Sequence, residues 1–189
     1  RATVKNTFVP VMCGSALKNK GIRFVLDAVN DYLPSPADVV PPVATNIKTG
    51  EKEDIKPNIE DPLCAYAYKI MTDPFVGTLT FTRIYSGLIK ASSYVYNTTT
   101  DTKERIGKIV KMHADQREIV DSAGPGDIVG LVGLKNTSTA HTLCNENHQV
   151  TLERIKYPDP VISMSIEPET RADQDKLGMA MKKLEAEDP

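Results

Sequence analysis

Thr78-Leu79-Thr80-Phe81-Thr82-Arg83-Ile84-Tyr85 is the stretch that decides the fold. Its residues alternate between two faces, and β-branched and aromatic side chains dominate both, which is typical of a strand in a sheet. Similar short runs occur on both sides, and we expect further strands over residues 63–72, 93–98, 104–114, 126–133 and 149–156. Turn residues such as Ser86-Gly87 separate them. Many short strands predict a small closed barrel or a sandwich, and we favour the barrel because it has no exposed edge strands.

Outside this β-rich region, residues 62–157, each flank has a single strand-like run followed by a helical pattern. Residues 8–13 alternate like a strand, and apolar residues at helical spacing predict a helix over 22–33 that Pro34 ends. Residues 160–166 alternate similarly, and a helix is expected from about 172 to 187. One strand and one helix cannot enclose a core, so residues 1–36 and 158–189 are expected to be parts of two further domains. Residues 37–61 are rich in proline and polar side chains and are interpreted as a linker.

The composition is that of an ordinary globular protein. The 189 residues include 23 basic and 25 acidic side chains, a net charge of −2, which argues against nucleic-acid binding over the whole surface but permits a local basic face. No apolar run approaches the ~20 residues that span a bilayer, and we expect no membrane association. Cys13, Cys64 and Cys144 lie far apart and are expected to be reduced thiols of a monomeric cytoplasmic protein.

Several motifs along the chain are distinctive. The first is Gly14-Ser15-Ala16-Leu17-Lys18-Asn19-Lys20-Gly21. The β-rich region contains Lys69-Ile70-Met71-Thr72-Asp73-Pro74-Phe75-Val76-Gly77 and Ile109-Val110-Lys111-Met112-His113-Ala114. The last is Ile166-Glu167-Pro168 with Ala172-Asp173-Gln174-Asp175. In turn, these motifs resemble the end of the GTPase domain, the second domain and the start of the third domain of bacterial elongation factor G, a translational GTPase. The motifs follow one another in the family's order over essentially the whole chain.

The resemblance implies a mainly β fold: a translation-factor β-barrel, which is the family's second domain. A C-terminal βα piece of a GTPase domain would precede it, and an N-terminal βα piece of a ferredoxin-like domain would follow it. The family hydrolyses GTP on the ribosome, with Mg²⁺, to drive movement of tRNA and mRNA. Gly-x-x-x-x-Gly-Lys-Ser/Thr, the phosphate-binding loop, does not occur in these 189 residues. We therefore expect a fragment that is not itself catalytic, binds no cofactor or metal, and contacts the ribosome.

The resemblance assigns Ser15, Ala16 and Leu17 to the guanine-binding loop of the complete protein. The small Ala16 side chain would leave room for the base. The alternative is a plain strand-to-helix turn in which Ser15 caps the next helix. For the chain by itself this alternative is favoured, because one wall of a pocket cannot bind a nucleotide.

Basic residues in the β-rich region are the candidates for contact with small-subunit ribosomal RNA. They are Arg83, Lys103, Arg105 and Lys111. Lys103, Arg105 and Lys111 lie at odd positions and are expected to share one strand face, whereas Lys108 would oppose them unless a bulge at Gly107 shifts the register. The alternative is a solvated face without a partner. The alternating tyrosines in the same strands are interpreted as barrel wall rather than as base-stacking platforms.

Two other functions remain open at this point. One is a different translational GTPase of the same architecture, of the ribosomal-protection or release-factor type. The other is a free-standing RNA-binding module of the OB type with no enzyme parent.

Overall fold

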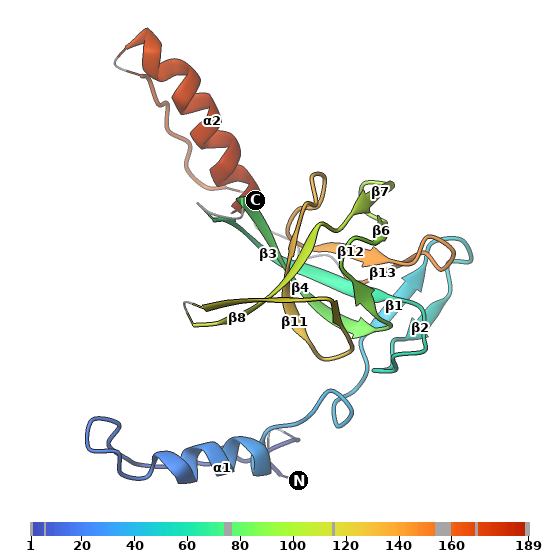
Figure 1. The fold of residues 1–189 in the computed structure, drawn as a ribbon, viewed down its shortest axis with the longest axis vertical. Helices are drawn as coiled ribbons and strands as arrows, with labels where there is room; N and C mark the ends of the chain where they lie inside the picture. The colour runs from blue at the N-terminus through green and yellow to red at the C-terminus, as the bar shows by residue number, and fades with distance from the viewer. Residues whose placement is uncertain are drawn as a thin grey trace. The chain divides into compact units, whose positions relative to one another are not determined.

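The computed structural model describes residues 2–5, 7–73, 77–114, 116–153, 160–168 and 170–187. The chain divides into two compact units, Arg1–Pro41 and Pro42–Pro189, which are drawn in Figure 1. Among the described residues, no helix is long and apolar enough to cross a membrane.

The N-terminal unit contains helix α1, Ile22–Tyr32, as the apolar spacing predicts. Gly21 forms its N-cap with φ 77°, and Leu33, directly before Pro34, is its extended C-cap. The strand expected over 8–13 does not form, and Phe8, Val9 and Val11 are exposed. A strand needs a hydrogen-bonded neighbour, and the described part of this unit supplies none.

The second unit is built on an eight-stranded antiparallel sheet with the order β7-β6-β12-β3-β4-β11-β8-β9. Figure 1 shows β3 and β4 crossing the middle of this sheet. The strands β5 and β10 form a separate two-stranded ribbon. The bounds are β3 Cys64–Asp73, β4 Gly77–Ser86, β5 Ile89–Lys90, β6 Tyr94–Asn97, β7 Thr102–Arg105, β8 Lys108–His113, β9 Gln116–Val120, β10 Ser122–Ala123, β11 Ile128–Val132 and β12 His141–Cys144.

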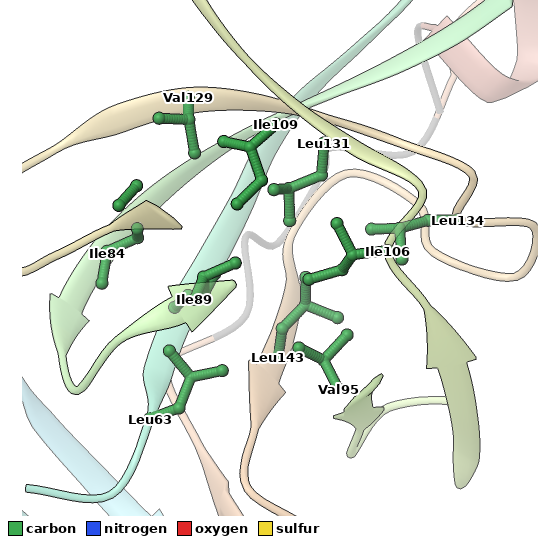
Figure 2. Packing of buried hydrophobic residues seen from close by; sticks show 12 residues of the cluster. Leu63, Ile84, Ile89, Val95, Ile106, Ile109, Val129, Leu131, Leu134 and Leu143 are labelled. Carbon is green, nitrogen blue, oxygen red and sulfur yellow. The ribbon is translucent and has the colours of Figure 1, made fainter. Parts of the chain in front are cut away.

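The sheet curves around one apolar core. In Figure 2, side chains from several strands meet in one interior, among them Ile84, Ile109, Leu131 and Leu143. From Thr80 onward, the even-numbered residues of β4 are the buried ones: Thr80, Thr82, Ile84 and Ser86 are all at most 3% exposed. The sequence shows the alternation that makes this possible, and the curved sheet is the mainly β, barrel-type fold that we expected.

The expected strand over 104–114 is broken into β7 and β8. The chain changes partners at Ile106-Gly107: the amide of Ile106 donates to the Ser93 carbonyl, and that of Gly107 donates to the Val132 carbonyl at 2.7 Å. β7 therefore pairs with β6, whereas β8 pairs with β11 and β9. A change of direction is favourable here because Ile106 becomes fully buried in the core.

The linker interpretation of residues 37–61 is wrong for residues 43–54. β1 Val43–Asn46 and β2 Lys52–Asp54 form a hairpin there, and β13 Val150–Thr151 pairs with β1. This three-stranded sheet covers a second core of Ala44, Ile55, Cys64, Cys144, Val150 and Leu152. The pattern was not visible in the sequence because only Ala44 and Ile55 of the hairpin region enter that core.

Helix α2, Arg171–Glu187, matches the helix expected from 172 to 187. The Thr170 hydroxyl donates to the Asp173 carboxylate at 2.6 Å at its N-terminus. The strand expected over 160–166 does not form, and Val161, Ile162, Met164 and Ile166 are exposed. As with residues 8–13, a strand pattern without a neighbouring strand stays unpaired.

Candidate nucleic-acid interface

A hollow of about 260 Å³ lies between the β6–β7 hairpin and the loop that follows β11. Its lining combines an aromatic ring, three cationic side chains and one carboxylate. The residues are Tyr94, Lys103, Glu104, Arg105, Gly133, Lys135 and Asn136. Two of the four basic residues predicted from the sequence, Lys103 and Arg105, therefore lie at one hollow, where Tyr94 and Lys135 join them.

The β6–β7 register places the basic side chains and the ring on one face. Tyr94 lies directly opposite Arg105, and Tyr96 lies opposite Lys103. Residues two apart in a strand point to the same side, so Lys103 and Arg105 share the face of Tyr94. The Lys103 Nζ lies 5.6 Å from the centre of the Tyr94 ring, a cation–π distance. Tyr94 is 61% exposed and accessible to a partner.

Lys103 also forms an ion pair with Glu146, with 2.5 Å between Nζ and Oε2. Both side chains are about half exposed, and surface pairs of this kind contribute little to stability. The pair therefore restrains Lys103 only weakly.

Glu104 fixes the loop that carries Lys135. It lies on the opposite, inward face of β7, beside Val95, and is only 5% exposed. Its carboxylate accepts the amides of Lys135 at 2.5 Å and Asn136 at 2.8 Å, and the Thr137 hydroxyl at 2.6 Å. Burial alone would raise the pKa of Glu104, but these donors stabilise the charged form and hold the pKa below its usual value.

Sequence reasoning missed Glu104 and Lys135. The sequence did contain a signal for Glu104, which stands between two basic residues in an alternating strand. If the two basic side chains face the solvent, the side chain between them must face inward. A buried carboxylate needs donors, and those donors had to come from elsewhere in the chain.

Asn97 and His141 continue the support of this loop behind the hollow. The buried Asn97 amide lies 3.1 Å from the Thr137 hydroxyl and 3.1 Å from Nδ1 of His141. The same ring nitrogen accepts the Ser138 amide at 3.1 Å. His141 therefore has a structural place at the start of β12. No three metal-ligating side chains converge anywhere in the part of the chain that the structure describes.

Lys111 does not share the face of Lys103 and Arg105, so that expectation was wrong. The break at Ile106-Gly107 moves Lys111 onto β8, in a different ladder. Its Nζ forms an ion pair with Asp127 at 3.0 Å. Burial alone would raise the pKa of Asp127, but the Gly124 amide and Lys111 hold it below its usual value.

Arg83 lies on β4, opposite Tyr66 of β3 and Ile128 of β11. Its guanidinium carbon is 5.4 Å from the Tyr85 ring centre, and its Nε is buried without a hydrogen-bond partner among the described residues. Three tyrosines are partly buried and pack against the second core, so part of each side chain belongs to the barrel wall: Tyr66, Tyr85 and Tyr96. Arg83 is thus one more cation on the surface of the barrel, separate from the hollow.

The loop Ser15–Leu17 forms a tight turn in the N-terminal unit. Ser15 and Lys20 exchange backbone hydrogen bonds of 2.9 and 3.0 Å, and the Asn19 amide donates to the Ala16 carbonyl. Ser15 does not cap the helix, since Gly21 is the N-cap of α1; its hydroxyl accepts the Lys18 amide within the turn. The amides of Ala16 and Leu17 take no part in these bonds, and Leu17 is 97% exposed.

Comparison with known proteins identifies both parts of the second unit. Residues 62–146 match the family model described as elongation factor G domain 2, and residues 157–189 match that of elongation factor G domain III. Over all 189 residues, the chain is 51% identical to "Elongation factor G 2" of Syntrophomonas wolfei, of which it covers 27%. A crystal structure of a Thermus thermophilus protein has the same fold, with a TM-score of 0.64 over 89% of this chain and 23% of the other, at 23% identity.

The chain thus spans about a quarter of the length of the curated relative that it matches. The two family models between them account for more than half of its residues, in the order that the sequence motifs follow. The chain belongs to the elongation factor G family, and the curved sheet around the Ile84 core is the second domain of that family.

Proposed function

We propose that this chain is the ribosome-contacting part of a translational GTPase that hydrolyses GTP to drive the movement of tRNA and mRNA. The family membership supports this proposal. We propose that the chain itself is not catalytic, because the phosphate-binding loop motif Gly-x-x-x-x-Gly-Lys-Ser/Thr does not occur in its 189 residues. In a complete protein, GTP and Mg²⁺ would bind elsewhere, and the amides of Ala16 and Leu17 would meet the guanine. In this proposal, the protein acts in the cytoplasm, where ribosomes are found.

Within this function, we propose that the hollow beside Tyr94 is the surface that contacts small-subunit ribosomal RNA. The observation that carries the proposal is the gathering of Lys103, Arg105 and Lys135 around one exposed aromatic ring. Lysine and arginine neutralise backbone phosphates, and an exposed tyrosine can stack on an unpaired base. RNA is bound largely through its shape and backbone, so the site needs no base-reading pattern.

Arg83 and Lys111 are secondary contacts in this proposal. Lys111 is neutralised by Asp127, and Arg83 is partly covered by its aromatic neighbours. Each contributes less positive potential than Arg105. Replacement of either one therefore weakens RNA binding less than replacement of Arg105.

The test is binding of the chain to purified small ribosomal subunits over a range of salt concentrations. The variant K103Q/R105Q/K135Q removes three cations from the hollow. We expect at least a tenfold loss of affinity at low salt. The slope of log affinity against log salt also falls by about two to three, because each phosphate contact contributes about 0.7 to 0.9.

The matched control is K48Q/K52Q/K56Q, which removes the same charge from exposed lysines in and next to the β1–β2 hairpin. Its affinity stays within about twofold of the unmodified chain if the hollow is the site. Equal losses for the two triple variants would show that binding is a general charge effect and would overturn the assignment to the hollow.

A further inference from the structure

We propose that Cys64 and Cys144 are a paired redox site, which forms a cross-strand disulfide when the chain folds in contact with a small disulfide oxidant. Cys64 begins β3 and Cys144 ends β12, and the two residues lie directly opposite each other in the antiparallel ladder. Side chains of directly opposed residues project from the same face of a sheet. The pairing is thus a property of the register.

The hydrogen-bond pattern around the two cysteines favours a disulfide. The Asn145 amide donates to the Leu63 carbonyl at 3.3 Å, which makes Leu63 and Asn145 the hydrogen-bonded pair at the end of this ladder. Because hydrogen-bonded and non-hydrogen-bonded pairs alternate, Cys64 and Cys144 occupy a non-hydrogen-bonded position. The Cα atoms of such a pair are about 4.5 Å apart, within the range that disulfides bridge.

The surroundings of the pair decide when it can react. Cys64 is 1% and Cys144 0% exposed, within the second core. Burial is the main cause that raises the pKa of Cys64 to about 12, and it also raises the pKa of Cys144. Since the thiolate is the reacting species, the folded pair is protected, and oxidation occurs while the second core is open.

The reaction is an ordinary thiol–disulfide exchange with a disulfide such as oxidised glutathione. The Cys64 thiolate attacks one glutathione sulfur, forms a mixed disulfide and releases one glutathione thiolate. The Cys144 thiolate then attacks the Cys64 sulfur and displaces the second glutathione. Two protein thiols lose two electrons and two protons, and one oxidised glutathione becomes two reduced molecules.

The bond would join two strands that organise the proposed RNA surface. In the sheet order, β12 lies between β3 and β6, and β6 and β7 carry Tyr94, Lys103 and Arg105. Once formed, the disulfide fixes β12 against β3 and lowers the entropy of the unfolded chain. Oxidation thus stabilises the barrel, and burial then keeps the bond from reductants.

The test uses the full chain with the exposed Cys13 replaced by serine, so that only the paired thiols remain. The C13S chain is unfolded in urea and refolded by dilution into a buffer with reduced and oxidised glutathione. We expect a product with two hydrogens fewer, a peptide map that links Cys64 to Cys144, and a native circular dichroism spectrum. Its urea midpoint exceeds that of the same chain refolded with reductant.

C13S/C64S and C13S/C144S serve as controls, because each has a single thiol and yields at most one glutathione adduct. The proposal is overturned if the C13S chain refolds to the native spectrum with both thiols free or both carrying glutathione. It is also overturned if the disulfide forms but the native spectrum is lost, because the register would then not suit the bond.

Discussion

Glu104 is the residue on which the shape of the proposed RNA surface depends most. Replacement by glutamine keeps the size of the side chain but removes a charge that receives three hydrogen bonds. Bonds to charged groups contribute about 1.5–3 kcal/mol each, and partial retention by the amide oxygen limits the loss. We expect E104Q to lower the free energy of unfolding by about 2 kcal/mol at pH 7, measured by urea denaturation.

The pH dependence of this effect follows from the direction of the pKa shift. The pKa of Glu104 is lower in the folded chain than its unfolded value of about 4.3. Its stabilisation is therefore complete above about pH 4.3 and is lost as the pH falls through the folded pKa. The stability difference between the unmodified chain and E104Q should shrink in this acidic range. E118Q replaces an exposed carboxylate and serves as the control, since its stability difference from the unmodified chain should show no comparable change with pH. If the stability difference between the unmodified chain and E104Q stayed constant down to pH 3, the stabilising role of the Glu104 charge would be contradicted.

At the scale of elements, the turn between β4 and β5 depends on Gly87. Gly50 provides a matched control site for substitutions at Gly87. Gly87 and Gly50 have nearly the same backbone angle, φ 72° and 74°. A Cβ at Gly87 would lie 2.6 Å from Cα of Leu63, whereas one at Gly50 meets nothing within 4 Å. Alanine at either position incurs the left-handed strain of about 1–2 kcal/mol, and G87A adds about 1–3 kcal/mol from the backbone clash.

Urea unfolding of G87A and G50A checks this difference directly. G87A should be less stable than G50A by at least about 1 kcal/mol, with β4 and the segment before β3 forced apart. Equal stabilities would mean that the turn relaxes away from Leu63 at little cost. The comparison separates steric contact from backbone strain because only the former differs between the two sites.

Some elements could be predicted from the sequence, and the reasons for success and failure are physical. The alternation of Thr78–Tyr85 and the helical spacing from Ile22 onward are local patterns, and β4 and α1 follow them. Residues 8–13 and 160–166 show the same alternation but remain unpaired, because strand formation depends on a neighbour that local pattern cannot supply. The β1–β2 hairpin has the opposite property: its local pattern is poor, and its stability comes from β13 and the second core.

At the scale of the whole molecule, the sequence motifs and their order were sufficient to predict the barrel and its family, which the comparisons confirm. Strand order was not predictable, because it depends on long-range contacts such as the change of partner at Ile106-Gly107. This is why Lys103 and Arg105 were grouped correctly, whereas Lys111 was grouped with them wrongly. Lys135 is held at the hollow by Glu104, a contact that links residues far apart in the chain.

The whole molecule also sets what the guanine loop can do in this chain. Two backbone amides, those of Ala16 and Leu17, are available to a base, but affinity for GTP depends on contacts to phosphates and Mg²⁺. No phosphate-binding motif occurs in the 189 residues. We therefore expect a fluorescent GTP analogue to show no saturable binding up to about 100 µM, which corresponds to less than about 5.5 kcal/mol of binding free energy. A dissociation constant in the micromolar range would contradict this and would locate a phosphate site among residues that no motif marks. In that case L17D, at an exposed position of the loop, would tell whether Ser15–Leu17 takes part.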